Sequence, residues 1–254
     1  MRRLLFYILT GLLLAAAAGC ADKSPPNTVH SPDDVPGKVI GAISGSPSAR
    51  LAGELGTLHS YDTAAELMVG LLAGSVDCVL MENTTAINLV DTTQGVRILS
   101  DPMLEYELSF AMAKENAELK NAINSALGVL STNGTLDGLR DKYFAGKAYV
   151  YTAPQNITPH PGTLTLAIST DDKPFSYIDD RGNYAGLNIQ VAIAVCDQLG
   201  VELQIAEYKT GELITSVWYG KANIAVGWLP GDVLDRVNLS DPYASSSHVI
   251  IVRK

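Results

Sequence analysis

The chain has 254 residues, of which 47% are hydrophobic and 18% charged, and it carries 18 Lys and Arg against 27 Asp and Glu. This apolar content supports a large buried core and argues against intrinsic disorder, and the length suits one large domain or two lobes. The formal charge of −9, without a long basic run, excludes a nucleic-acid surface, because phosphate contacts need clustered Lys and Arg. Three cysteines are too few for a disulfide scaffold.

The first 19 residues predict an export signal. Arg2 and Arg3 precede an apolar run over residues 4–18 that is too short to span a bilayer comfortably. The small residues before Cys20 resemble a bacterial lipoprotein cleavage box, although Ala17 stands where that box usually has Leu. We therefore expect a signal peptide over 1–19, lipid on Cys20 and a flexible tether over 20–36. A cleaved signal without lipid is the alternative, and either places the body of the protein outside the cytoplasm.

Short apolar runs then alternate with amphipathic stretches, which predicts α/β lobes with mainly parallel sheets. Buried strands are expected over residues 38–43, 77–81, 202–206 and 223–226.

Helices are expected where apolar residues recur on one face. One is expected over residues 47–55, and the other three faces consist of Ala64, Leu67, Met68, Leu71 and Leu72, then Leu119, Ile123, Ala126, Leu127 and Leu130, and then Ile189, Ala192, Ile193, Cys196 and Leu199. Thr63 and Glu66 predict a capping box, and Gly200 predicts a helix end. Cys78 and Cys196 lie within apolar patterns and are expected to be buried free thiols.

A comparison within the chain indicates two lobes of the same kind. Residues 66–77 and 212–223 share the pattern Glu-Leu-(Met or Ile), then Gly, then Asp or Asn, at constant spacing, and each segment runs into an expected buried strand. Two similar α/β lobes imply a ligand cleft between them, since ligands bind beyond the carboxyl ends of strands in such sheets.

Two blocks of the chain resemble the two halves of the family-3 extracellular solute-binding proteins. The N-terminal half of that family resembles residues 163–254, through KPFSY at 173–177, YAGLNI at 184–189, LGV at 199–201, NLSDPY at 238–243 and HVIIVRK at 248–254. Its C-terminal half resembles residues 37–146, through GKV at 37–39, SGS at 44–46, VDCV at 76–79, NGT at 133–135 and DKYFAG at 141–146. The resemblance implies a two-lobed, periplasmic-binding-protein-like (Venus flytrap) α/β fold.

The halves stand in the reverse of the family order, so we interpret the chain as circularly permuted, with lobe 2 first. Residues 37–107 are then lobe 2, and lobe 1 combines its C-terminal helices at 115–146 with its main part at 161–246. Hinge strands are expected at 108–114 and 247–254, and residues 147–160 are the permutation linker, long enough to join termini on one lobe. A fragment of a tandem protein and a domain-swapped dimer are the competing interpretations, so the chain is a monomer or a swapped dimer.

Three residues of lobe 2 are candidate ligand contacts. Ser44 and Ser46 flank the start of the helix at 47–55, where backbone N–H groups favour an anionic ligand group; a plain helix cap is the alternative. In the family a Thr or Ser at the position of Ser46 contacts ligand carboxylate. Glu82 follows a buried strand and would pair with a ligand ammonium, as the family's Asp there implies; a solvated acid at a helix start is the alternative.

Lobe 1 contributes a second group of candidates. Ser169, Asp171 and Asp172 follow its first strand, and Asp172 falls near a position where the family often has an aromatic residue. Tyr208 and Trp228 each follow a strand and could stack on a ligand or belong to the core. Phe175 is expected in the core.

One family feature is missing from the cleft. Amino-acid-binding members carry an Arg several residues after the Gly matching Gly227, and it forms a bidentate pair with the ligand carboxylate. Residues 228–235 contain no Arg, while acids occupy positions 82, 171 and 172. A standard α-amino-acid ligand is therefore in question, and a cationic or polyhydroxyl ligand becomes plausible.

The expected function is capture of a small polar solute, an amino acid or a related amine, for uptake by an ABC permease. A sensing or scavenging module without a permease is the second hypothesis. A dehydratase-like enzyme is the third, with an acid pair such as Glu82 and Asp171 in acid–base work. The four His show no metal-ligand spacing, and no nucleophile elbow or phosphate loop occurs, so we expect neither metal nor cofactor.

Overall fold

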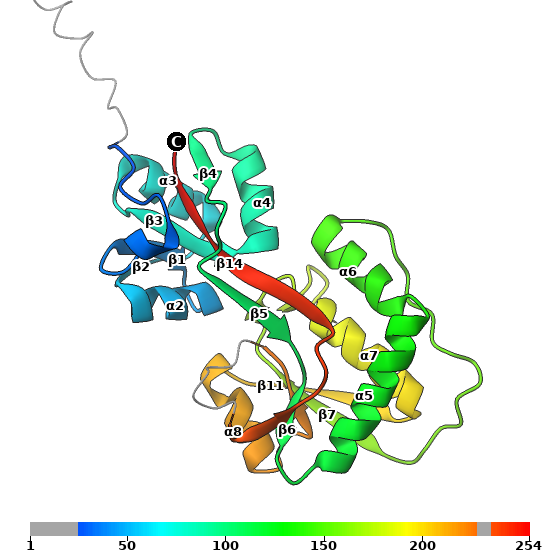
Figure 1. Cartoon of the computed structure of the whole chain (residues 1–254). Helices are drawn as coiled ribbons and strands as arrows, with labels where there is room; N and C mark the ends of the chain where they lie inside the picture. The colour runs from blue at the N-terminus through cyan, green and yellow to red at the C-terminus, as the bar shows by residue number, and fades with distance from the viewer. Residues whose placement is uncertain (1–24, 228–234) are drawn as a thin grey trace, which may run out of the picture.

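A computed structural model describes residues 25–227 and 235–254, and it consists of two α/β lobes linked by crossing strands (Figure 1). The export signal, Cys20 and Trp228 lie outside the described residues. No helix in the described part of the chain has the length and apolar character needed to cross a bilayer.

Lobe 2 is built on a sheet of order β2-β1-β3-β14-β4, in which β5 also pairs with β14. Its strands are β1 (Val39–Ile43), β2 (Thr57–Tyr61), β3 (Cys78–Glu82), β4 (Val96–Ile98), β5 (Leu104–Leu108) and β14 (Ala244–Arg253). Its helices are α2 (Pro47–Leu55), α3 (Ala64–Ala73) and α4 (Asn83–Thr92), preceded by the short η1 (Pro32–Asp34). Apolar residues of α2 pack on one face of the sheet, and those of α3 and α4 pack on the other.

Lobe 1 has a sheet of order β11-β7-β12-β6-β13 and a small three-stranded sheet of order β10-β9-β8. Its strands are β6 (Ala111–Ala113), β7 (Thr163–Ile168), β8 (Asp171–Asp172), β9 (Ser176–Ile178), β10 (Tyr184–Ala185), β11 (Glu202–Glu207), β12 (Ile224–Ala225) and β13 (Val237–Leu239). Its helices are α5 (Ala117–Thr132), α6 (Thr135–Ala145), α7 (Leu187–Leu199), η2 (Thr210–Glu212) and α8 (Leu213–Trp218). Helices α5, α6 and α7 cover one face of the main sheet, and α8 packs on the other face.

The two main sheets have the same strand order. In each, the first strand pairs in parallel with the second and third, and a strand from a distant part of the chain is inserted antiparallel beside the third. The inserted strand is β14 in lobe 2 and β6 in lobe 1.

The internal repeat seen in the sequence corresponds to the same pair of hydrogen bonds in each lobe. The backbone N–H of Asp77 donates to the carbonyl of Val39, and the Asp77 carboxylate accepts from the N–H of Val39 at 2.9 Å. Asn223 makes the same two bonds to Thr165, its side-chain oxygen accepting at 2.7 Å. In both lobes this side chain therefore fixes the start of the third strand against the first.

Most of the predicted elements are confirmed, with ends shifted by one or two residues. Thr63 and Glu66 form the capping box of α3, and Gly200 ends α7 in the left-handed conformation. Cys78 and Cys196 are buried and free, and burial raises the pKa of each thiol to about 12. Phe175 is fully buried in the core of lobe 1.

The segment before β1 differs from the flexible tether predicted up to residue 36. Val29 and Val35 are fully buried in the α2 side of the lobe 2 core. The guanidinium of Arg253 donates to the carbonyls of Pro25 and Pro26 at 2.9 and 3.4 Å. Residues 25–36 are therefore packed on lobe 2, and they lie beside the last residues of the chain.

Two antiparallel strands connect the lobes. The first half of β14 pairs with β5, and its second half pairs with β3 and β4 inside lobe 2. Figure 1 shows β14 running beside β5 from one lobe to the other. The linker after α6 has no helix or strand up to Thr163, and the N–H of His160 fixes its end by donating to the carbonyl of Gly200 at 2.7 Å.

Candidate ligand site between the lobes

The described candidate residues follow the carboxyl ends of strands in both lobes, apart from Glu82, which is the last residue of β3. Ser44 and Ser46 follow β1. Ser169, Asp171 and Asp172 follow β7, and Tyr208 follows β11. The loops of the two lobes lie close together: a Cβ placed on Gly45, after β1, would be 3.9 Å from Oδ2 of Asp171.

The two serines of lobe 2 have local partners. The Ser46 hydroxyl caps α2, accepting from the N–H of Ala49 at 3.1 Å and donating to the carbonyl of Ile43 at 2.7 Å. Ser44 donates to the carboxylate of Asp62 at 3.2 Å. Because Pro47 begins α2 without an N–H, this helix start offers fewer free donors than a usual anion site. In this conformation Ser46 therefore acts as a helix cap, which is the alternative to ligand contact that the sequence left open.

Glu82 is a buried helix cap, with 7% of its surface exposed, rather than the solvated acid of the alternative interpretation. Its Oε2 accepts from the N–H of Thr85 at 3.0 Å and from the Thr85 hydroxyl at 3.3 Å. Its Oε1 accepts from the hydroxyl of Ser246 at 2.6 Å, which connects the end of β3 to the crossing strand β14. The carboxylate is thus held rigidly at the base of α4.

Asp172 of lobe 1 lies close enough to Glu82 for the charge of that carboxylate to act on it. Burial, and then the negative charges of Glu82 and Asp171, raise the pKa of Asp172 to about 7. Asp171 and Asp172 form β8, which pairs with β9 through Tyr177 and Ser176, so the pair sits on a short hairpin. An acid of each lobe therefore contributes to the same region, and no cation pairs with Asp172 among residues 25–227 and 235–254.

The two remaining described candidates lie deeper in lobe 1. Ser169 is buried and accepts a hydrogen bond from the hydroxyl of Thr210 at 3.1 Å. Tyr208 is half-buried against the cluster that packs α8 on the sheet, and its N–H donates to the carbonyl of Ile168 at 2.8 Å.

The crossing strands add residues that the sequence analysis missed. Tyr106 of β5 and Ser246 of β14 are register partners, and the Tyr106 ring stacks on His248 with 5.1 Å between ring centroids. Residues 246, 248, 250 and 252 of β14 share one face of the strand, the face that packs toward α2 and also carries Glu82. The opposite face carries the exposed Glu105, Glu107 and Ser245.

The electrostatics of this inner face follow from burial and from the two acids. Burial, and then the charges of Asp172 and Glu82, raise the pKa of Tyr106 far above its usual value, so its hydroxyl is a proton donor at neutral pH. Burial lowers the pKa of His248 to about 4. The His248 Nδ1 lies 2.9 Å from the Ser48 hydroxyl, and its Nε2 is buried with no partner among the described residues.

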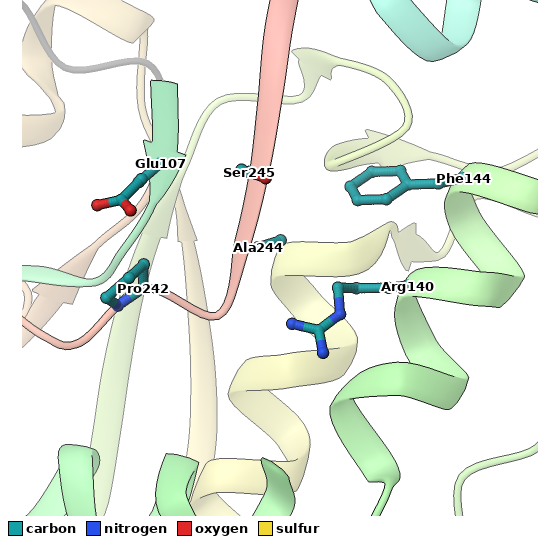
Figure 2. A pocket seen from close by; sticks show the side chains of 6 residues that line it. All are labelled: Glu107, Arg140, Phe144, Pro242, Ala244 and Ser245. Carbon is teal, nitrogen blue, oxygen red and sulfur yellow. The ribbon is translucent and has the colours of Figure 1, made fainter. Parts of the chain in front are cut away.

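Away from this site, described residues line two pockets. One, of about 390 Å³, is on the outer side of the hinge, where Arg140 and Phe144 of α6 extend toward Ala244 and Ser245 (Figure 2). Arg140 is already engaged there, because it donates to the carbonyl of Tyr243 at 3.0 Å and pairs with Asp137. The other, of about 490 Å³, lies between the linker and the α7–β11 turn. No group of metal-ligating side chains occurs in the part of the chain that the structure describes.

Comparisons with known proteins identify part of the chain. Residues 164–254 match the profile of bacterial extracellular solute-binding proteins, family 3, which confirms the resemblance inferred for the block at 163–254. The probable amino-acid-binding protein YxeM of Bacillus subtilis is 28% identical over 130 residues, which are 48% of this chain and 49% of that protein. The L-cystine-binding protein TcyJ of Escherichia coli K12 is 26% identical over 126 residues, 48% of this chain and 47% of that protein. The chain thus spans about half the length of these relatives.

Solved structures give partial matches. A phosphate-binding protein of a phosphate ABC transporter from Streptococcus pneumoniae covers 86% of this chain and 89% of its own, with 13% identity and a TM-score of 0.48. The arginine-bound form of domain 1 from TmArgBP covers 37% of this chain and 81% of its own, with 28% identity and a TM-score of 0.31.

Proposed function

We propose that this chain, whose residues 164–254 match the family-3 extracellular solute-binding proteins, captures a small cationic solute between its two lobes outside the cytoplasm. The observation that supports the proposal is the convergence of acids from both lobes: the loop with Asp171 and Asp172 approaches Gly45 of lobe 2, and the charge of Glu82 acts on Asp172. A ligand ammonium between them would gain charge-assisted hydrogen bonds and remove a like-charge repulsion.

The cleft supports an amine better than a standard amino acid. Residues 228–235 lack the Arg that would pair with a carboxylate, and Pro47 reduces the donors at the start of α2. Tyr106 adds an aromatic ring near Glu82 and Asp172, and such a ring can contact an ammonium group. The relatives YxeM and TcyJ are described as amino-acid-binding and L-cystine-binding proteins, so an amino acid with a cationic side chain fits both arguments.

Binding requires the lobes to close around the solute. In the described residues the lobes are joined by the paired strands β5 and β14 and by the short β5–β6 connection, so we place the hinge there. A ligand that contacts Glu82 and Asp172 together stabilises the closed arrangement by its differential affinity for it.

The test uses residues 21–254, purified without Cys20. Mass spectrometry of the solute released on denaturation, followed by thermal-shift measurements with L-lysine, 1,5-diaminopentane, L-cystine and glucose, identifies the ligand class. We expect the two amines to raise the melting temperature and Glu82→Gln to abolish that shift. The matched control is Glu105→Gln, which neutralises an exposed acid on the outer face of β5. A rise in melting temperature with glucose alone would contradict a cationic ligand. If no solute is released and no compound raises the melting temperature, the proposed binding function is contradicted.

We further propose binding without turnover. The relatives are described as binding proteins, and Glu82 is engaged by Thr85 and Ser246 rather than free for proton transfer. The bound solute should therefore be recovered chemically unchanged, whereas a dehydratase-like activity would return a product of lower mass.

We propose an arrangement at the cell surface as well. Lipid on Cys20 would hold lobe 2 close to the membrane, because only residues 21–24 separate that cysteine from the packed segment at residue 25. An ABC permease is the proposed partner. Membrane fractionation of wild type and Cys20→Ser tests the anchor: the variant should appear in the soluble fraction.

The permuted order is part of the proposal. It is supported by the shared strand order of the two sheets and by the position of the last strand, β14, in the middle of the lobe 2 sheet.

A further inference from the structure

The two acids of lobe 1 lie on a hairpin that has little structure of its own. Asp171 and Asp172 form β8, a strand of two residues, which pairs with the three-residue β9. A hairpin this short is marginally stable by itself, so the place of the acids must be set by what the hairpin packs against.

The start of α7 holds the turn of this hairpin through its backbone. The N–H of Leu187 donates to the carbonyl of Pro174 at 3.1 Å. The N–H of Asn188 donates to the carbonyl of Phe175 at 2.9 Å. A Cβ on Gly186 would clash with this second carbonyl, so the close approach requires a glycine there. The hairpin is thus fixed on the first turn of α7.

The Asn188 side chain extends this support to the crossing strand. Its Nδ2 donates to the hydroxyl of Ser176 in β9 at 3.0 Å, and its Oδ1 accepts from the hydroxyl of Tyr243 at 2.7 Å. Asn188 is fully buried, and the other two residues are 1% exposed, so the two bonds form a continuous network away from water. Ser176 is the register partner of Asp172, and Tyr243 immediately precedes β14.

Tyr243 is itself fixed in lobe 1. Its N–H donates to the carbonyl of Leu108, at the end of β5, at 2.9 Å. Its carbonyl accepts from Arg140 of α6 at 3.0 Å, and its ring lies 4.9 Å from that of Phe110 between centroids.

The first residues of β14 are therefore a common reference for the acids of both lobes. Ser246 bonds to the Glu82 carboxylate at 2.6 Å. Tyr243, three residues earlier, bonds through Asn188 to the strand that pairs with Asp172. Loss of either connection would let the acids of one lobe shift relative to those of the other.

We propose that Asn188 and Tyr243 are positioning residues: they hold the hairpin of Asp171 and Asp172 at a fixed place relative to β14, and thereby set the affinity of the site for its solute. The part of this statement that concerns affinity rests on the proposed function, and the part that concerns the hairpin does not. Both side chains are buried, so they act without contacting the solute. An amide suits this role because it donates to one hydroxyl and accepts from the other.

Hydrogen–deuterium exchange of the ligand-free protein tests the hairpin part. Tyr243→Phe keeps the packed ring and removes only the donor to Asn188. The backbone amides of residues 175–178 should then exchange about fivefold faster, the effect of one lost buried hydrogen bond on a local opening equilibrium. Ser176→Ala removes the other end of the network and should have the same effect. The matched control is Tyr149→Phe, because Tyr149 packs on the same core and its hydroxyl makes no hydrogen bond within the described residues.

Titration calorimetry with 1,5-diaminopentane tests the affinity part. Tyr243→Phe and Ser176→Ala should each weaken binding about fivefold. The double variant should bind no more weakly than either single variant, because both substitutions break the same connection. Tyr149→Phe should bind like the wild type.

The outcomes keep this proposal apart from the proposed function. Unchanged exchange at residues 175–178 in both variants would overturn the positioning. Faster exchange with unchanged amine affinity, or additive losses of affinity in the double variant, would show that the network is only structural. A wild type that binds no amine would contradict the proposed ligand class and the affinity part, and the exchange rates would then decide the hairpin part by themselves. Circular dichroism of each variant checks that the fold is retained.

Discussion

Replacing Arg253 by Met should destabilise lobe 2 strongly, although this residue is the penultimate one of the chain. Its side chain is 4% exposed. Its Nη1 donates to the carbonyls of Leu71 and Val76, both at 2.7 Å, and its Nε donates to that of Pro25 at 2.9 Å. These carbonyls belong to the end of α3, the turn before β3 and the start of the packed N-terminal segment.

The magnitude follows from the groups left behind. A buried carbonyl that loses its donor costs about 1–3 kcal/mol. Pro25 is exposed and can be rehydrated, so two such carbonyls remain, and the expected loss is about 3–5 kcal/mol. For a chain of this size, about 2–4 °C of melting temperature is lost per kcal/mol, which gives a fall of roughly 10 °C.

The assay is thermal unfolding followed by circular dichroism at pH 7.5, with Lys254→Met as the matched control. Lys254 is exposed and bonds through its backbone N–H alone among the contacts described, so its variant should melt like the wild type. Deleting residues 25–28 should cost less than Arg253→Met, because the two buried carbonyls keep their donor. A melting temperature of Arg253→Met within 2 °C of the wild type would refute the reasoning.

Three further predictions concern the site and the ends of the chain. Glu82→Gln should lower amine affinity at least tenfold and leave the ligand-free melting temperature within a few degrees, because the amide oxygen can still cap α4; a large loss of stability would show that the carboxylate is only structural. His248→Gln should make the free energy of unfolding less sensitive to acid. Burial lowers the pKa of His248 in the folded state to about 4, so the wild type loses up to about 3 kcal/mol of stability as the pH falls from 6.5 to 4. Urea unfolding of both proteins at pH 7.5 and pH 4.5 measures the difference. A chain relinked in family order should be a folded monomer that binds the same solute. Lys254 is joined to Pro25 through a short Gly-Ser segment, which keeps the packed residues 25–36, and the chain is opened within 147–160. An insoluble or non-binding product would contradict the permutation.

The helices and buried strands could be predicted because their signals are local. The stripes of α3, α5 and α7 recur at helical spacing, and Thr63, Glu66 and Gly200 mark the ends that the structure confirms. The packing of residues 25–36 could not be predicted in this way. Val29 and Val35 are isolated apolar residues in a polar stretch, and Arg253, which bonds to Pro25, is 228 residues away in sequence.

In the candidate site, too, local features could be predicted and contacts between distant residues could not. Ser46 and Glu82 were recognised as residues at strand ends, but the sequence left ligand contact and helix capping as alternatives, and the structure gives both residues a cap geometry. Tyr106 could have been found, because residues 104–108 alternate between apolar and acidic side chains as a strand with one inner face does. The role of His248 could not have been predicted, because its hydrogen-bond partner Ser48 is 200 residues away in sequence.

The crossing strand β14 joins these observations into one mechanical argument. Its first half lies at the hinge, where Ser246 bonds to Glu82 and pairs with Tyr106. Its second half is a central strand of lobe 2, ending at the buried Arg253. Movement of lobe 1 is therefore transmitted along a strand whose far end is fixed, so bending must concentrate near residues 244–247 rather than in the sheet. The carboxylate of Glu82 is bonded to the strand at this point, so a ligand bound by Glu82 would act directly on the residues where bending is expected.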